Sequence, residues 1–149
     1  MVGVAMSFLD TGKVCTFSNI SGVITKDGKP VKNALVKRTV VYGSEYEDET
    51  YTDGSGRFAM PALFTRSISK YLPQEFIVNQ KIAVFIDGKE YEIWEGVKRY
   101  PQENAEARGV PIVVQCELEN DKELYMVDGQ AFFTSCSWDI EKDIVNTGF

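Results

Sequence analysis

The sequence predicts an all-β protein: a single antiparallel β-sandwich domain over residues 1–149, with an added β-hairpin and at most one or two short helices. Asp-Gly turn signals recur at Asp27-Gly28, Asp53-Gly54 and Asp87-Gly88, and such dipeptides favour the tight turns that join strands. The segments between them are rich in β-branched and aromatic residues, which favour strands. Their spacing of about ten residues is typical of a sandwich.

The first half of the chain divides into strands and turns on these signals. Residues 17–25 are expected to form a strand, which the turn at Asp27-Gly28 connects to a second strand at residues 34–42. The acidic residues 45–49 are expected to form a loop. A tight turn at residues 53–56 then leads into a strand at residues 57–60.

The second half contains the clearest hairpin signal, centred on Asp87-Gly88. In its second arm Tyr91 and Ile93 alternate with Glu90 and Glu92. Because side chains alternate between the two faces of a strand, one face should be apolar and the other solvated. The two arms are residues 81–86 and 89–94.

The remaining segments carry weaker signals. Residues 110–118 and 124–133 are two further strand candidates. Residues 62–72 are expected to hold one short helix that ends before Pro73. Residues 101–108 are expected to form a polar loop or a single helical turn.

Three motifs in the first half carry a family resemblance: Gly22-Val23, residues 28–36 (GKPVKNALV) and residues 52–58 (TDGSGRF). Together they resemble the carboxypeptidase-regulatory-like, or transthyretin-like, β-sandwich module. The resemblance implies a family-like core at about residues 17–64, with residues 65–149 as an elaboration. It implies a fold and no activity, because this module serves as a spacer, a stalk or a binding domain.

Physical reasons account for the motif residues. Glycine permits the left-handed conformation that closes a turn, and Pro30 fixes φ where the chain leaves one. Ala34 and Phe58 are expected to face the core. The residues with expected structural roles are Gly28, Pro30, Ala34, Arg38, Asp53, Gly56 and Phe58.

Arg38 lies on the same alternating face as Ala34 and Val36, so its side chain should point inward. A buried guanidinium needs an anionic partner. We expect a carboxylate of the acidic loop to supply a bidentate ion pair, with a ligand-binding arginine as the alternative.

Composition excludes several classes of function. The chain has no histidine, which removes Ser-His-Asp and Cys-His catalysis and any zinc site that needs imidazole. The formal net charge of −6 disfavours nucleic acid and anionic membranes as partners. Neither a cofactor nor a metal is expected.

Three cysteines, Cys15, Cys116 and Cys136, lie far apart in the sequence and form no CxxC pair. They are expected to be buried free thiols in a reducing compartment, with a Cys15–Cys136 disulfide as the alternative. No membrane-spanning run is present, and the N-terminus lacks a basic residue before Asp10. We expect a cytoplasmic protein, or a periplasmic or exported one if a signal sequence has been removed.

Two groups of residues are candidates for binding a partner protein. Clustered carboxylates steer association with a basic partner, and aromatic side chains beside charged ones are typical of interface hot spots. Calcium is the alternative ligand of the acidic group, but the DxDxDG spacing is absent. Glu90 and Glu92 are expected to form a solvated strand face and not a glycosidase pair. The partner-binding candidates are Glu45, Glu47, Asp48, Glu49, Trp94 and Tyr100.

These features predict a non-catalytic protein-binding domain. A specific version is a small bacterial immunity-type protein that neutralises a toxin by occupying its active site. The alternative is a structural or accessory sandwich module of a surface or secretion apparatus. An enzyme is not expected, because no convergent set of carboxylates, lysines or tyrosines replaces the missing histidine.

Overall fold

The computed structural model describes residues 12–67 and 76–144. Within them strands alternate with short turns, and the helical content is one 3-10 turn at Ala105–Ala107. The predicted all-β class is therefore confirmed. The strands are β1 (Lys13–Phe17), β2 (Ile20–Lys26), β3 (Lys29–Pro30), β4 (Leu35–Tyr42), β5 (Ser44–Tyr51), β6 (Arg57–Met60), β7 (Leu63–Arg66), β8 (Val78–Ile86), β9 (Lys89–Lys98), β10 (Ile112–Glu117), β11 (Glu123–Val127), β12 (Gln130–Thr134) and β13 (Cys136–Trp138).

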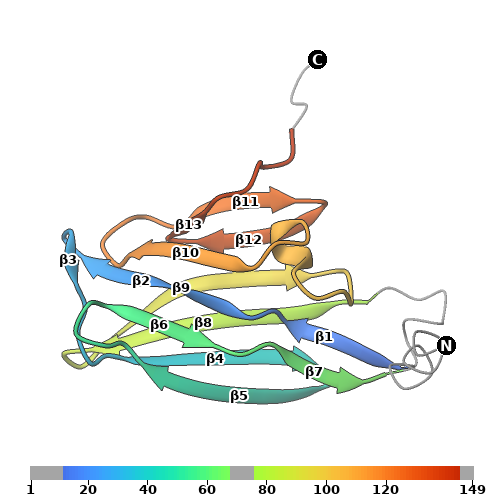
Figure 1. The fold of residues 1–149 in the computed structure, drawn as a ribbon, viewed down its shortest axis with the longest axis horizontal. Coiled ribbons are helices and arrows are strands. Elements are labelled where there is room, and N and C mark those ends of the chain that lie inside the picture. Colours follow the sequence, from blue (N-terminus) through green and yellow to red (C-terminus); the bar gives the residue numbers. More distant parts are fainter. Residues whose placement is uncertain (1–11, 68–75, 145–149) are drawn as a thin grey trace, which may run out of the picture.

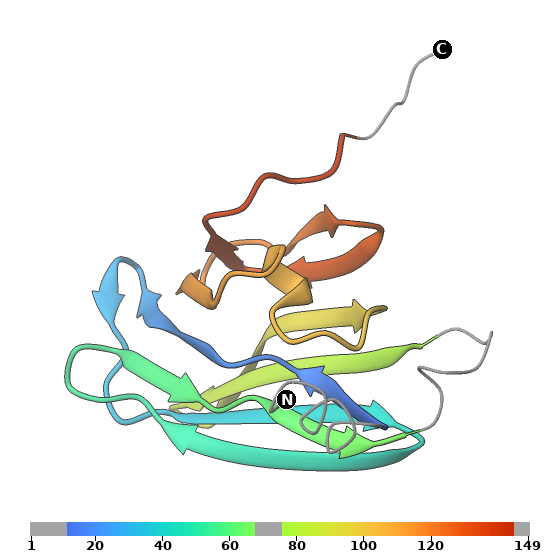
Figure 2. The same ribbon diagram turned by 45° about the vertical axis from the view of Figure 1, so that its right-hand side comes forward.

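Two layers of strands enclose the core (Figures 1 and 2). The larger layer is a six-stranded sheet in the order β11-β12-β9-β8-β4-β5. The smaller layer has the order β13-β10-β2-β3, with β6 paired to β2, and the β1–β7 ribbon continues along it. Inward-facing side chains such as Val36, Ile82 and Ile24 are fully buried between the layers, as expected of a sandwich.

Asp-Gly turns close three hairpins of the same kind. Asp27 and Gly28 have φ of 54° and 79°, and Asp87 and Gly88 have 51° and 75°. Two consecutive positive φ values define the type I′ turn, whose twist matches that of the flanking strands. The third such turn, Asp128-Gly129, joins β11 to β12. The prediction of one strand over residues 124–133 was therefore wrong, because this turn divides the segment into a hairpin.

Residues 63–66 are the strand β7 and not part of the short helix expected at residues 62–72. β7 pairs antiparallel with β1, placing Phe64 opposite Cys15 and Thr65 opposite Val14. This pairing satisfies the main chain of both strands and overrides a weak helix signal. Residues 68–72 lie outside the described residues. The single helical turn expected within residues 101–108 is present at Ala105–Ala107.

The acidic stretch expected to be a loop is the edge strand β5. It pairs with β4 along its whole length, with Arg38 opposite Asp48 and Thr39 opposite Glu47. The β-branched residues of β4 favour this pairing. A strand at a sheet edge tolerates charged side chains because much of it faces water.

One ladder of the smaller sheet is parallel, in contrast to the otherwise antiparallel pairing. β10 runs parallel to β2, with Ile112 opposite Ile20 and Val114 opposite Gly22. A Cβ built on Gly22 would lie 2.1 Å from the carbonyl oxygen of Val114. Only glycine allows the two main chains to approach so closely at this point.

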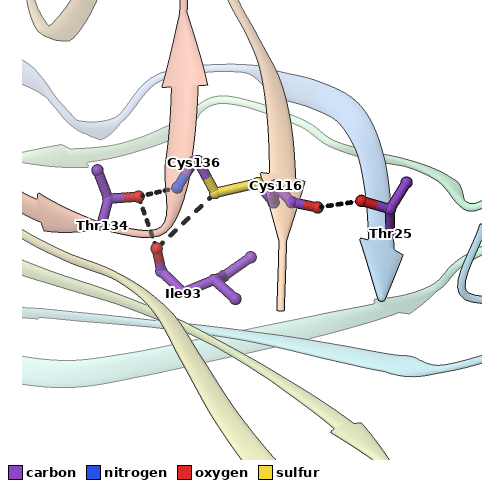
Figure 3. The surroundings of a disulfide bond; sticks show 5 residues. All are labelled: Thr25, Ile93, Cys116, Thr134 and Cys136. Atoms are coloured by element: carbon purple, nitrogen blue, oxygen red, sulfur yellow. Dashed lines mark hydrogen bonds between the residues drawn. A yellow bond between two sulfur atoms is a disulfide. The ribbon is translucent and has the colours of Figure 1, made fainter. Parts of the chain in front are cut away.

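The cysteine pairing differs from both sequence-based expectations. Cys116 and Cys136 lie directly opposite each other on β10 and β13 and form a disulfide, whereas Cys15 is a buried free thiol. Figure 3 shows the bond beside Thr134, whose hydroxyl donates to the carbonyl of Ile93 at 2.6 Å. The same hydroxyl accepts the N–H of Cys136 at 2.9 Å. This contact fixes the point where the chain passes from β12 in one sheet to β13 in the other.

The motif residues of the first half occupy the positions expected of them. Ala34 and Phe58 are buried, and Pro30 lies exposed on the short strand β3. Gly56 has a φ of 77°, and a Cβ there would meet the carbonyl oxygen of Ile24 at 2.6 Å. Asp53 accepts the N–H groups of Arg57 and Ser55, and these two hydrogen bonds lower the pKa of its carboxyl.

Within the part of the chain that the structure describes, no helix is long and apolar enough to cross a membrane.

Candidate protein-binding face

The outer face of the six-stranded sheet is hollowed and open to solvent. We call this surface the outer face: the side chains that point away from the core on the strands from β5 to β11. The hollow in this face has a volume of about 810 Å³. Among the described residues no element covers it, since the smaller layer packs on the other side of the sheet.

The register of the sheet explains which side chains meet there. Thr39 of β4 lies opposite Glu47 of β5 and Lys81 of β8. Lys81 lies opposite Glu95, and Glu95 lies opposite Phe133. Neighbouring strands are about 4.8 Å apart, so this one row spans roughly 24 Å. The complete row, from one edge of the sheet to the other, is Glu47, Thr39, Lys81, Glu95, Phe133 and Leu124.

Exposed apolar side chains of the outer face lie on β11 and β12 at one side of the sheet and at Val41 of β4 near the other. Leu124 and Phe133 expose 61% and 40% of their surface, and Val41 exposes 37%. Ala83 and Phe85 lie between them on β8. Exposed apolar side chains gathered in a hollow, and not scattered singly, mark a contact surface for another molecule.

Two lysines form ion pairs with the three glutamates of β9. Lys81 Nζ lies 2.9 Å from Glu92 Oε1 and 3.9 Å from Glu90 Oε2. Lys122 Nζ lies 3.3 Å from Glu95 Oε1 and 5.0 Å from the ring centre of Phe133. The ion pair with Glu92 raises the pKa of the Lys81 ammonium. Glu90 and Glu92 therefore lie on a solvated face, as the sequence predicted, and both have a lysine as ion-pair partner.

The glutamates of β5 are not balanced in this way. Glu45, Glu47 and Glu49 occupy every second position of the strand and point to the outer face, opposite Val41, Thr39 and Lys37. None of the three forms an ion pair with a residue in the described ranges 12–67 and 76–144. The acidic group predicted from the sequence therefore contributes three exposed carboxylates to this face.

Asp48, the fourth member of that group, points the other way. Its carboxylate accepts two hydrogen bonds from Arg38, from Nε at 2.9 Å and Nη2 at 2.6 Å. Arg38 also donates to the carbonyl of Pro61 at 2.7 Å and lies over the ring of Phe17. The expected bidentate pair is therefore present. The structure therefore does not bring Asp48 together with Glu45, Glu47 and Glu49, because adjacent strand residues face opposite sides of the sheet.

Trp94 is buried, which contradicts its predicted place at an interface. Its exposed fraction is 0%, and its ring packs 4.9 Å from that of Trp138 and 5.1 Å from that of Phe132. A β-bulge at Ile82/Ala83 leaves Ile93 as an extra residue on β9. One extra residue reverses the side-chain phase of the strand, so Ile93 and Trp94 both face inward.

Tyr100 is exposed but lies far along the sheet from β5. It exposes 43% of its surface, and its hydroxyl donates to the carbonyl of Asp128 at 2.8 Å, in the β11–β12 turn. β11 and β5 are the opposite edges of the six-stranded sheet. The structure therefore does not bring Tyr100 together with the acidic residues.

A buried polar cluster lies inside the sandwich and was not predicted. Glu106 accepts hydrogen bonds from the Ser18 hydroxyl at 2.6 Å and from the Gln80 amide at 3.0 Å. Gln80 in turn accepts the indole N–H of Trp94 at 3.0 Å. Gln80 and Glu106 are at least 97% buried, and the carboxylate also accepts the N–H of Ser18 at 3.0 Å. The cluster is thus closed to a substrate and acts in packing.

Lys98 lies at the margin of this cluster and is fully buried. Its ammonium donates to the carbonyls of Tyr100 and Gln102, which anchors the loop after β9. Burial lowers the pKa of Lys98 and raises that of the Cys15 thiol. Lys98 follows Trp94 and Gly96 at two-residue spacing on β9, so its side chain points to the same inward side of the sheet. This alternation is the sequence signal that could have placed Lys98 in the interior.

No group of three or more potential metal ligands occurs within residues 12–67 and 76–144.

The comparisons with known proteins assign the chain to a family. Residues 20–121, well over half the chain, match the model described as a domain of unknown function (DUF6795). The match begins at β2 and ends after β10, so it contains both strands of the parallel pair. Neither the curated proteins nor the solved structures contain a match. The chain belongs to the DUF6795 family.

Proposed function

We propose that this protein is a non-catalytic binding domain that recognises another protein through the outer face of its six-stranded sheet. The observation that carries the proposal is the open hollow with Leu124 and Phe133 exposed in it and the carboxylates of β5 at its border. Exposed apolar side chains next to charged ones are common in protein interfaces.

Site-specific photo-crosslinking tests the proposal. A photoreactive phenylalanine replaces Thr39, on the outer face of β4 beside the edge strand β5. In a matched control it replaces Val113, which is 58% exposed on the smaller sheet. Both proteins are produced in the native cell and irradiated. We expect an adduct of defined mass from position 39 and none from position 113.

The dependence of that adduct on the exposed apolar side chains completes the test. The double variant Leu124→Ser/Phe133→Ser removes the two most exposed apolar side chains of the hollow while leaving the core intact. We expect it to abolish the adduct at position 39. An adduct that forms equally in the variant, or equally from position 113, contradicts a binding role for this face.

An immunity-type protein is the narrower version of this function. It is supported by the unpaired glutamates of β5, which are suited to a cleft that binds an anionic substrate. Its test is co-expression of the crosslinked partner with and without the protein: rescue of growth supports it, and a harmless partner rejects it.

A structural or accessory module of a surface or secretion apparatus is the second candidate. The Cys116–Cys136 disulfide favours it, because disulfides persist mainly in oxidising compartments. A cytoplasmic protein is expected to hold these thiols reduced. Because all three cysteines are buried, cells are quenched in acid and the protein is alkylated under denaturing conditions. Mass measurement then distinguishes one modified cysteine from three and so separates the two compartments.

A further inference from the structure

We propose that the outer face receives an extended, cationic segment of the partner, which adds to the edge strand β5 as a further strand of the six-stranded sheet. This inference rests on the proposed function and names the chemistry of the partner. Two observations support it: the outer edge of β5 is open, and the carboxylates of Glu45, Glu47 and Glu49 recur along it without ion-pair partners among the described residues.

β5 offers a long free edge. It runs for eight residues, Ser44–Tyr51, and pairs with β4 on one side. No strand in the described part of the chain pairs with its other side. Its residues are exposed or half-buried throughout. An edge of this kind presents main-chain N–H and C=O groups that an extended peptide can pair with.

The carboxylates of β5 recur with the period of a strand. Glu45, Glu47 and Glu49 are separated by two residues each, which is about 7 Å along an extended chain. An added strand places every second side chain on the same face, directly beside these residues. Lysine or arginine at alternating positions of the partner would therefore meet all three carboxylates at once.

The charge balance of the face favours that occupant over a neutral or acidic one. The glutamates of β9 already have Lys81 and Lys122 as ion-pair partners, whereas the three on β5 have none among the described residues. A cationic segment would form ion pairs with these three carboxylates, whereas an acidic segment would be repelled by them. On the opposite side of the strand, Tyr46 is 53% exposed and offers an aromatic surface to the alternate, apolar residues of the segment.

Synthetic peptides test the inference on the full chain. The probe is a fluorescein-labelled octapeptide of alternating lysine and valine, and its binding is measured by fluorescence anisotropy at low salt. Two matched peptides are used: one with glutamate in place of lysine, and one with lysine and valine but N-methylated at every second residue. The N-methylated peptide keeps the charge but loses the N–H donors of one strand edge.

We expect the lysine–valine peptide to bind and both matched peptides to bind at least about tenfold more weakly. The Glu47→Lys variant should weaken binding of the lysine–valine peptide about tenfold. The control variant Glu119→Lys makes the same change of charge at an exposed carboxylate that does not line the outer face, and it should change binding less than about twofold. Backbone NMR shifts caused by the peptide should centre on β5.

Three results overturn the inference. Equal binding of the N-methylated peptide shows charge attraction without an added strand. Equal loss in Glu47→Lys and Glu119→Lys shows attraction by the net charge of the protein and not by a site on β5. Absence of binding by all three peptides shows that the acidic edge only prevents pairing with other strands. In each case the crosslink from position 39 tests the proposed binding function separately. Failure of the added-strand inference can therefore be distinguished from failure of the proposed function.

Discussion

Reduction of the Cys116–Cys136 disulfide is expected to lower the free energy of unfolding by about 3 kcal/mol. The two cysteines are separated by 20 residues, and closing a loop of that length removes about 3 kcal/mol of chain entropy from the unfolded state. The bond also holds the three-residue strand β13 against β10. Trp138 on β13 packs against Trp94 in the core, so the reduced protein should lose this packing first.

Urea unfolding followed by tryptophan fluorescence measures the effect. The oxidised protein is compared with the same protein in a phosphine reductant, and Cys15→Ala serves as a control in which only the bonded pair responds to reduction. For an m-value of about 2 kcal/mol/M, the midpoint should fall by about 1.5 M. A fall below about 0.3 M would refute the reasoning. So would peptide mapping of the oxidised protein that finds Cys15 in the bond.

Three further predictions concern the core and the turns. Asp48→Ala should destabilise the protein by about 3 kcal/mol because it leaves the buried Arg38 guanidinium without its carboxylate partner. Adding Arg38→Met should recover most of that loss in a double-mutant cycle of urea midpoints. Main-chain N–H groups, that of Glu119 foremost, hold the pKa of Glu117 at about 2, so its contribution to stability is present above pH 4.5 and lost as the pH falls toward 2. Glu117→Gln should therefore flatten the dependence of Tm on pH between 4.5 and 2. Gly22→Ala should cost more than about 3 kcal/mol because its Cβ would overlap the main chain of β10. Gly54→Ala, which meets no atom within 4 Å, should leave the urea midpoint nearly unchanged.

Local features of this fold could be predicted from the sequence. The turn at Asp87-Gly88 depends only on residues that tolerate positive φ. The inward direction of Arg38, and its need for a carboxylate, follow from strand alternation alone. The turn at Asp128-Gly129 has the same local signal and could have been predicted in the same way.

Features that depend on distant residues could not be predicted. The β-bulge at Ile82/Ala83 arises from the pairing of two strands, and it turned Trp94 from an expected surface residue into a core residue. The cysteine pairing depends on where β13 leaves the larger sheet, which no local pattern specifies. The outer face likewise exists only once the register aligns Glu47 with Thr39 and Lys81.

The parallel pairing of β2 with β10 has a consequence for synthesis of the protein. Thr25 and Cys116, which meet across this ladder, are 91 residues apart in the chain. At a translation rate of about 5 to 20 residues per second, one edge of β2 stays without its partner for about 5 to 20 seconds after that strand is made. Contacts of such high sequence separation slow folding. The nascent chain should therefore depend on chaperones during elongation, and its folding should be slowest at the step that inserts β10.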